Sequence, residues 1–163
     1  MILKQFKHIT TFIFDIDGVL TDGTLFVFDS GEQFRRINIK DGYALRLAIK
    51  KGHNVAVISE GNAEALKLFL NKLGINDIFP DVENKKEKLE GYVREKGVNW
   101  KEVLFMGDDM ADYGVMQQAG LPCAPADAAA EIKQISKYIS PFKGGEGCAR
   151  DVIEKVLRLN DQW

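Results

Sequence analysis

Short apolar runs alternate with longer amphipathic stretches along this chain, and this alternation constrains the fold more than any other feature. The short runs, rich in β-branched and aromatic side chains, predict strands at residues 10–14, 54–59, 78–79, 103–106, 121–124 and 138–139. The longer stretches predict helices at residues 41–51, 63–73, 85–96, 112–119, 128–136 and 149–159. Strands that alternate with helices form a parallel sheet covered on both faces, so we expect an α/β, three-layer, Rossmann-like fold.

The composition is that of a globular protein of modest size. The chain has 163 residues, 45% of them hydrophobic, and a formal net charge of −2. This length predicts one domain over residues 1–163, and the charge argues against nucleic acid or an anionic membrane as a partner. No apolar run could span a bilayer and the amino terminus lacks a signal-peptide core, so we expect a cytoplasmic protein. Cys123 and Cys148 lack metal-site spacing and are expected to be buried free thiols.

A β-hairpin is predicted directly after the first strand. Residues 24–28 and 33–38 flank the turn sequence Asp29-Ser30-Gly31-Glu32. An isolated two-stranded hairpin is marginal in water, and its apolar edges invite pairing with another chain. The apolar side chains that association of several copies would bury are Leu25, Val27, Phe28, Phe34 and Ile37.

Two carboxylates follow the first predicted strand. Asp15 and Asp17 stand one residue apart, and Gly18 comes directly after them. A parallel strand that ends in acids delivers charge to the carboxyl edge of the sheet, where open α/β folds bind their ligands. The alternative is a surface turn, because Asp and Gly are common in turns. The catalytic interpretation is favoured for this segment.

Polar side chains also follow the later strands. Ser59 ends the second strand, Lys85 opens the helix after the third, and Asp108 follows the fourth, with Asp112 one helical turn further on. Carboxylate oxygens of Asp15 and Asp108 suit Mg²⁺, and a serine beside the backbone N–H groups at a helix start suits phosphate. Taken singly, these residues fit helix caps, turn acids and a solvated lysine, but their shared edge favours phosphoryl transfer with a carboxylate nucleophile.

These residues resemble the four motifs of the haloacid dehalogenase-like hydrolase superfamily, over nearly the whole chain. Residues 15–21 (DIDGVLT) resemble the first motif, Ser59 the second, Lys85 the third, and residues 107–112 (GDDMAD) approximate the fourth. The resemblance implies that Asp15 is the nucleophile forming an aspartyl-phosphate and that Asp17 is the general acid and then the base. It also implies that Asp15, the backbone carbonyl of Asp17, and Asp108 bind Mg²⁺, that Asp112 supports them, and that Ser59 and Lys85 hold the phosphoryl oxygens.

A narrower resemblance comes from the hairpin, from Lys40-Asp41-Gly42 and from the tail at residues 144–150 (GGEGCAR). These segments look like the phosphatases that act on 3-deoxy-D-manno-octulosonate 8-phosphate. The resemblance implies a fold without a cap domain, a homotetramer in which a neighbouring subunit helps to close the active site, and a role in lipopolysaccharide biosynthesis. Within it, Arg150 is a candidate contact for the substrate carboxylate.

The second motif departs from the pattern of these phosphatases. They commonly have glycine directly after the motif residue, whereas here Glu60 follows Ser59 and the glycine is displaced to position 61. An acid near an anionic substrate bears on the choice of substrate, so Glu60, Glu64 and Lys67 are candidate specificity residues or, equally, a solvated helix face.

Two alternatives to the eight-carbon substrate remain open. One keeps the chemistry but takes a nine-carbon, sialic-acid-type 9-phosphate. The other is a non-catalytic oligomerisation or regulatory module, against which the complete set of Asp15, Asp17, Ser59, Lys85 and Asp108 argues.

Overall fold

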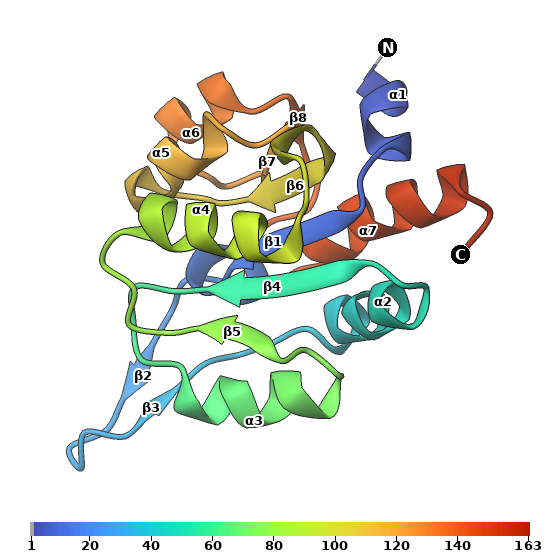
Figure 1. Cartoon of the computed structure of the whole chain (residues 1–163). Coiled ribbons are helices and arrows are strands. Elements are labelled where there is room, and N and C mark those ends of the chain that lie inside the picture. The colour runs from blue at the N-terminus through green and yellow to red at the C-terminus, as the bar shows by residue number, and fades with distance from the viewer. Residues whose placement is uncertain (1) are drawn as a thin grey trace.

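The computed structural model describes residues 2–163 and contains a six-stranded parallel sheet between two layers of helices (Figure 1). The strand order is β5-β4-β1-β6-β7-β8, which places β1 near the centre of the sheet. The strands are β1 (Thr11–Asp15), β4 (Asn54–Ile58), β5 (Asp77–Phe79), β6 (Val103–Met106), β7 (Leu121–Ala124) and β8 (Tyr138–Ile139). The predicted fold class is therefore confirmed.

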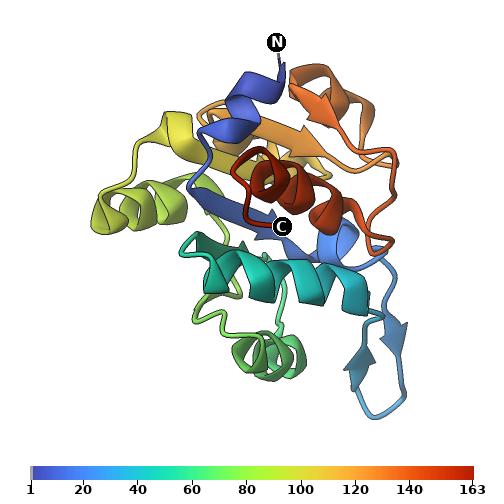
Figure 2. The same cartoon turned by 90° about the vertical axis from the view of Figure 1, so that its right-hand side faces the viewer.

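The alternation of side chains along the strands builds a separate core on each face of the sheet. In β1, Phe12 and Phe14 pack into one core whereas Ile13 points into the other. The helices that contribute to the first core are α1 (Ile2–Lys7), α2 (Ile39–Lys50), α3 (Glu64–Lys72) and α7 (Cys148–Leu159). The helices on the opposite face are α4 (Lys85–Lys96), α5 (Tyr113–Met116) and α6 (Ala130–Ile135). Figure 2 shows α2 and α7 side by side over the first face.

Most of the predicted elements are confirmed, and two predictions differ from the structure. The helix predicted at residues 112–119 is instead a helical turn, Met110–Asp112, followed by the short α5. It begins earlier because the Asp109 side chain caps the turn at the backbone N–H of Met110. Helix α1, whose buried Phe6 closes one end of the core, was not predicted. Cys123 and Cys148 are buried free thiols, as expected.

The β2–β3 hairpin projects away from the body of the molecule (Figure 1). Its two strands, β2 (Phe26–Val27) and β3 (Gln33–Phe34), pair only with each other in an antiparallel arrangement. A single bridge between Thr21 and Ile37 continues the pairing at the base. Between β1 and α2 lie only a helical turn, Ile16–Leu20, and the hairpin, and the segment between β4 and α4 holds just α3, β5 and their connections. Across residues 2–163, no helix is both long and apolar enough to cross a membrane.

Candidate active site

The carboxyl ends of β1, β4 and β6 open into a hollow of about 430 Å³. Its lining comes from four separated segments of the chain, which are the four that the sequence singled out. The lining residues are Asp15, Asp17, Gly23, Ser59, Glu60, Gly61, Lys85 and residues 108–112. The parallel sheet thus brings together groups that lie far apart in the sequence, as the strand-end pattern predicted.

Lys85 lies at the floor of this hollow between two carboxylates. Its Nζ atom is 2.7 Å from Asp15 Oδ1 and 2.7 Å from Asp112 Oδ1, and its side chain is only 3% exposed. The alternative of a solvated helix-surface lysine is therefore wrong for Lys85, although its neighbour Lys86 is exposed. A buried lysine is retained when it is paired, and here it is paired twice.

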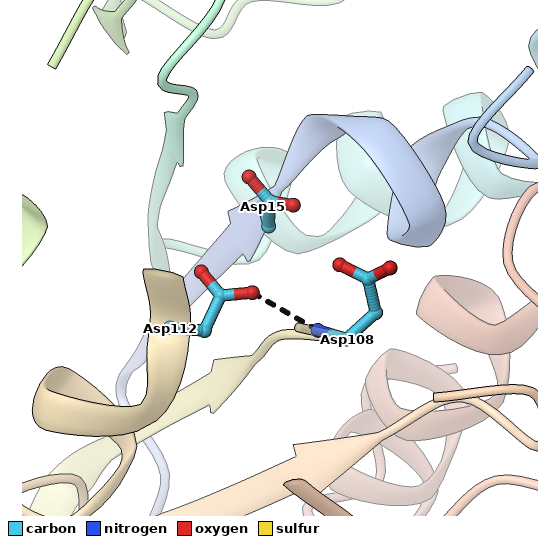
Figure 3. Close-up of side chains that lie close together, drawn as sticks. All are labelled: Asp15, Asp108 and Asp112. Atoms are coloured by element: carbon cyan, nitrogen blue, oxygen red, sulfur yellow. Dashed lines mark hydrogen bonds between the residues drawn. The ribbon is translucent and has the colours of Figure 1, made fainter. Parts of the chain in front are cut away.

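Asp15, Asp108 and Asp112 form a compact acidic cluster (Figure 3). Each offers a carboxylate oxygen, and these three oxygens lie within 4.8 Å of one another. Asp112 is held in place because its Oδ2 accepts the backbone N–H of Asp108 at 3.0 Å. Hard divalent cations bind where several carboxylate oxygens lie close together, so this cluster fits such an ion.

Two glycines make this close approach possible. Gly18 has a φ of +90°, and a Cβ at this position would lie 1.9 Å from Asp108 Oδ2. At Gly107, a Cβ would lie 2.5 Å from the side chain of Asp112. Both positions therefore exclude any larger residue, and the glycines that follow β1 and β6 are required by the packing of the acids.

The electrostatics of the cluster favour an added positive charge. Burial, and then the nearby Asp112, raise the pKa of Asp108 to about 7. Burial and the charge of Asp112 likewise raise the pKa of Asp15 well above its ordinary value, although Lys85 opposes this. Burial lowers the pKa of Lys85, but Asp15 and Asp112 more than offset this effect and raise it to about 12. One lysine thus does not neutralise three acids.

Asp17 lies outside the acidic cluster and points its carboxylate towards the hairpin. Its Oδ1 accepts hydrogen bonds from Thr21 Oγ1 at 3.1 Å and from Arg35 Nε at 2.8 Å, and its Oδ2 accepts from Arg35 Nη2 at 3.2 Å. Arg35 is a site residue that sequence reasoning missed. Nothing in the sequence distinguishes it from the adjacent Arg36, which is exposed.

Ser59 is buried at the end of β4, and its Oγ accepts the backbone N–H of Gly61 at 3.1 Å. The alternative of a helix cap is wrong, because α3 begins only at Glu64. Glu60 is exposed and lines the hollow.

The remaining predicted substrate residues lie outside this lining. Lys67 is half-buried on α3, and Glu64 is exposed at its start. Arg150 lines a different hollow beside α7, where its Nε donates to Glu154 at 3.3 Å and its guanidinium lies over the ring of Trp163. Within one chain, the structure therefore brings Glu60 to the hollow but not Lys67 or Arg150.

Known proteins share both this sequence pattern and this fold. The family model of the haloacid dehalogenase-like hydrolases matches residues 62–151. The 3-deoxy-D-manno-octulosonate 8-phosphate phosphatase of Yersinia pestis is 30% identical over 161 residues, which cover 99% of this chain and 86% of that protein. The same enzyme from Escherichia coli K12 is 30% identical over 156 residues, which cover 96% of this chain and 83% of that protein.

Solved structures agree with these sequence relatives. The crystal structure of the Yersinia pestis phosphatase superimposes with a TM-score of 0.95 and 31% identity, covering 98% of this chain and 86% of that chain. A structure of the Moraxella catarrhalis phosphatase, in complex with a magnesium ion, a phosphate ion and a KDO molecule, superimposes with a TM-score of 0.93 and 26% identity, covering 97% of this chain and 91% of that chain. This chain therefore belongs to the haloacid dehalogenase-like hydrolases, as a phosphatase of the 3-deoxy-D-manno-octulosonate 8-phosphate phosphatase-like family.

Proposed function

We propose that this protein is a Mg²⁺-dependent phosphatase that hydrolyses 3-deoxy-D-manno-octulosonate 8-phosphate through an aspartyl-phosphate on Asp15. The observation that carries the proposal is the cluster of the buried Asp15, Lys85 and Asp112 with the half-buried Asp108 at one edge of the sheet. The relatives named above supply the substrate, because they carry that activity in their names.

The acidic cluster fits a magnesium ion. Asp15 and Asp108 would hold it through side-chain oxygens and Asp17 through its backbone carbonyl. Burial, and then the charge of Asp112, raise the pKa of both Asp15 and Asp108, and a bound cation would offset both effects. When bound, Mg²⁺ polarises the phosphoryl group and offsets its charge against that of the acids.

Asp15 is placed to act as the nucleophile. One of its carboxylate oxygens forms a bond to phosphorus as the bond between phosphorus and the sugar oxygen breaks. Lys85 donates two of its three N–H bonds to Asp15 and Asp112, which leaves one for a phosphoryl oxygen. The Ser59 hydroxyl borders the same hollow and donates to another phosphoryl oxygen.

Asp17 moves the protons. It gives a proton to the departing sugar oxygen in the first step, which yields the free sugar acid and phosphorylated Asp15. In the second step it takes a proton from water, whose oxygen attacks phosphorus, so that inorganic phosphate leaves and both aspartates return to their starting state. Its partly exposed carboxylate lines the hollow, within reach of both reacting groups.

We further propose that hairpins from several copies associate into the homotetramer. The hairpin side chains Phe26, Val27, Phe28 and Phe34 are 52–66% exposed in the single chain, although they are apolar. Association would cover them and give a site without a cap domain the walls that its own chain lacks. Lys67 and Arg150 would then contribute to substrate binding across such an assembly.

A side-by-side turnover assay tests the function. Chelator-treated protein is incubated with the eight-carbon 8-phosphate or with a nine-carbon, sialic-acid-type 9-phosphate, with and without added Mg²⁺, and released phosphate is measured. We expect turnover only with Mg²⁺ and a higher kcat/KM for the eight-carbon ester. A higher kcat/KM for the nine-carbon ester would identify it as the substrate in place of the eight-carbon ester. Failure to hydrolyse either ester or p-nitrophenyl phosphate would favour the non-catalytic module.

A further inference from the structure

The more buried of two ion pairs that join the hairpin to the loop after β1 is formed by Arg35 and Asp17. The guanidinium of Arg35, two residues before the base of the hairpin, donates hydrogen bonds to both oxygens of the Asp17 carboxylate. The Arg35 side chain is only 8% exposed, whereas that of Asp17 is 33% exposed and lines the hollow. Planar pairing of this kind fixes the orientation of a carboxylate as well as its charge.

The adjacent arginine shows that this arrangement is specific. Arg36 carries the same charge on the same strand arm, but its side chain is 62% exposed and reaches the exposed partners Asp22, at 3.1 Å, and Glu146, at 3.9 Å. An exposed pair of this kind stabilises a protein very little. Arg35 is instead drawn inward against a residue of the candidate active site, at the cost of burying a guanidinium.

The two oxygens of Asp17 are held unequally. Oδ1 accepts two hydrogen bonds, at 2.8 Å from Arg35 Nε and at 3.1 Å from Thr21 Oγ1. Thr21 is itself fixed, because its hydroxyl oxygen accepts the backbone N–H groups of Gly18 and Gly23. Oδ2 accepts a single, longer bond of 3.2 Å. Oδ1 is therefore the anchored oxygen and Oδ2 the one that is freer to carry a proton.

Oδ2 also borders the space in which a phosphate ester would sit. A Cβ on Gly61 would lie 4.0 Å from Asp17 Oδ2, 3.6 Å from Arg35 Nη2 and 3.9 Å from Ser59 Oγ. These three groups thus surround one point of the hollow, which glycine leaves open. The displaced glycine of the second motif accordingly stands beside the Arg35–Asp17 pair.

We propose that Arg35 is a positioning residue for proton transfer: it anchors Asp17 Oδ1 so that Oδ2 faces the departing oxygen of the phosphate ester. Arg35 is not among the residues that line the hollow, and in this proposal it acts through Asp17. The hairpin therefore serves the active site of its own chain, in addition to any role between chains. The inference rests on the proposed function, because it assigns Asp17 the proton given to the leaving group.

The dependence on leaving group tests this role. p-Nitrophenolate is a good leaving group and departs without a proton. Phenolate depends on protonation and a sugar alkoxide depends on it more strongly, so loss of a well-placed acid slows the cleavage of these two esters. We expect Arg35→Met to lower kcat/KM, which reports the steps up to departure of the leaving group, for phenyl phosphate and for the sugar-acid phosphate by about 10–100-fold, and for p-nitrophenyl phosphate by less than about threefold. The matched control Arg36→Met removes the same charge one residue away and should leave kcat for all three esters within about twofold of wild type.

A double-variant comparison separates positioning from a general structural role. In an Asp17→Asn background, Arg35→Met should cause no further loss, since its partner has already been disabled. If Arg35→Met fails to fold, Arg35→Lys keeps one donor for Oδ1, and the same selectivity by leaving group is expected at a smaller magnitude. Equal losses of kcat/KM on all esters, additive losses in the double variant, or a raised KM at unchanged kcat would overturn the proposal.

The assays distinguish a failure of the proposed function from a failure of the role proposed for Arg35. Wild-type protein that hydrolyses aryl phosphates but not the sugar-acid phosphate would refute the proposed substrate, and the two aryl esters would still decide the role of Arg35. Wild-type protein that hydrolyses no phosphate ester in the presence of Mg²⁺ would overturn both.

Discussion

The hollow at the sheet edge and the β2–β3 hairpin invert the usual distribution of side chains in opposite ways. In the hollow, Lys85 and two of the acids are almost completely buried, although charged residues rarely are. In the hairpin, large apolar side chains such as Val27 are exposed, although they gain most from burial. The charged residues of the hollow are held by the core of the chain itself, which favours a catalytic role for them. The apolar side chains of the hairpin are not covered by the described part of the chain, which favours a surface that binds a partner.

The hollow and the hairpin also differ in the strand pairing that fixes their positions. Asp15 ends β1, and Asp108 and Asp112 follow the adjacent strand β6, so the parallel pairing of these two strands brings the acids together. The hairpin strands pair only with each other and have two residues each. Changes in the hollow should therefore alter chemistry and local stability, whereas changes to the exposed apolar side chains of the hairpin should alter assembly.

The largest expected effect is on the nucleophile. Asp15→Asn should lower turnover by at least about 10³-fold, because an amide does not attack phosphorus as a carboxylate does and weakens the cation site. Far-ultraviolet circular dichroism should show an intact fold. The matched control is Asp29→Asn, which makes the same change in the exposed hairpin turn and should leave turnover unchanged. A variant at position 15 with near wild-type activity would exclude Asp15 as the nucleophile.

Removal of the buried lysine should affect chemistry and stability together. Lys85→Met leaves Asp15 and Asp112 without their shared partner, so we expect about 10²–10³-fold lower kcat and a free energy of unfolding reduced by about 3 kcal/mol. Urea unfolding in the presence of a chelator measures the stability. The exposed neighbour supplies the control, since Lys86→Met should change neither quantity appreciably. Equal effects at the two positions would contradict the buried pairing.

In the hairpin, a charge should break the assembly and leave the chain folded. Val27→Asp should convert a tetramer to smaller species in sedimentation at micromolar concentration, because it places a carboxylate in the surface proposed to be covered. Turnover of the sugar-acid phosphate should fall by about tenfold, or ~1.4 kcal/mol, and turnover of p-nitrophenyl phosphate should fall less. Ser30→Asp adds the same charge at the hairpin turn and is the control. A fully active wild-type monomer would refute the assembly.

The smallest effect expected is a dependence of metal-free stability on pH. The carboxyl of Asp108 keeps its proton up to about pH 7 in the folded protein but loses it near pH 3.8 when unfolded. The folded state therefore binds more protons in this window, and the free energy of unfolding falls as pH rises from about 4 to 7. The loss should be at least about 1 kcal/mol, and Asp41, whose pKa burial raises to about 6, contributes in the same direction.

Chelated protein unfolded by urea at pH 5 and pH 7.5 checks this dependence. Added Mg²⁺ should restore stability at the higher pH, and Asp108→Asn should flatten the profile of the chelated protein. Stability that rises between pH 5 and pH 7.5 without metal would show that burial and the neighbouring Asp112 do not raise the pKa of Asp108.

The sequence by itself determined the architecture and the chemistry of the hollow. Strand periodicity and helix stops are local properties, so the parallel sheet and most of its helices followed from them. Because parallel strands share one carboxyl edge, the acids after β1 and β6 could be expected to meet Ser59 and Lys85 without any coordinates. The helix predicted at residues 112–119 has different bounds in the structure, because the side chains of Asp109 and Asp112 cap an earlier turn at Met110–Asp112.

Only the tertiary structure decided which member of a chemically equivalent pair enters the site. Lys85 and Lys86, or Arg35 and Arg36, are indistinguishable as sequence neighbours, yet one of each pair is buried and the other exposed. The tertiary structure also decided where Arg150 lies. The sequence associates this residue with the substrate, but the fold places it beside Glu154 and Trp163. The physical reason is that burial and pairing depend on the rotation of each helix and strand against its neighbours. That rotation is set by packing of the whole core, not by the residues on either side.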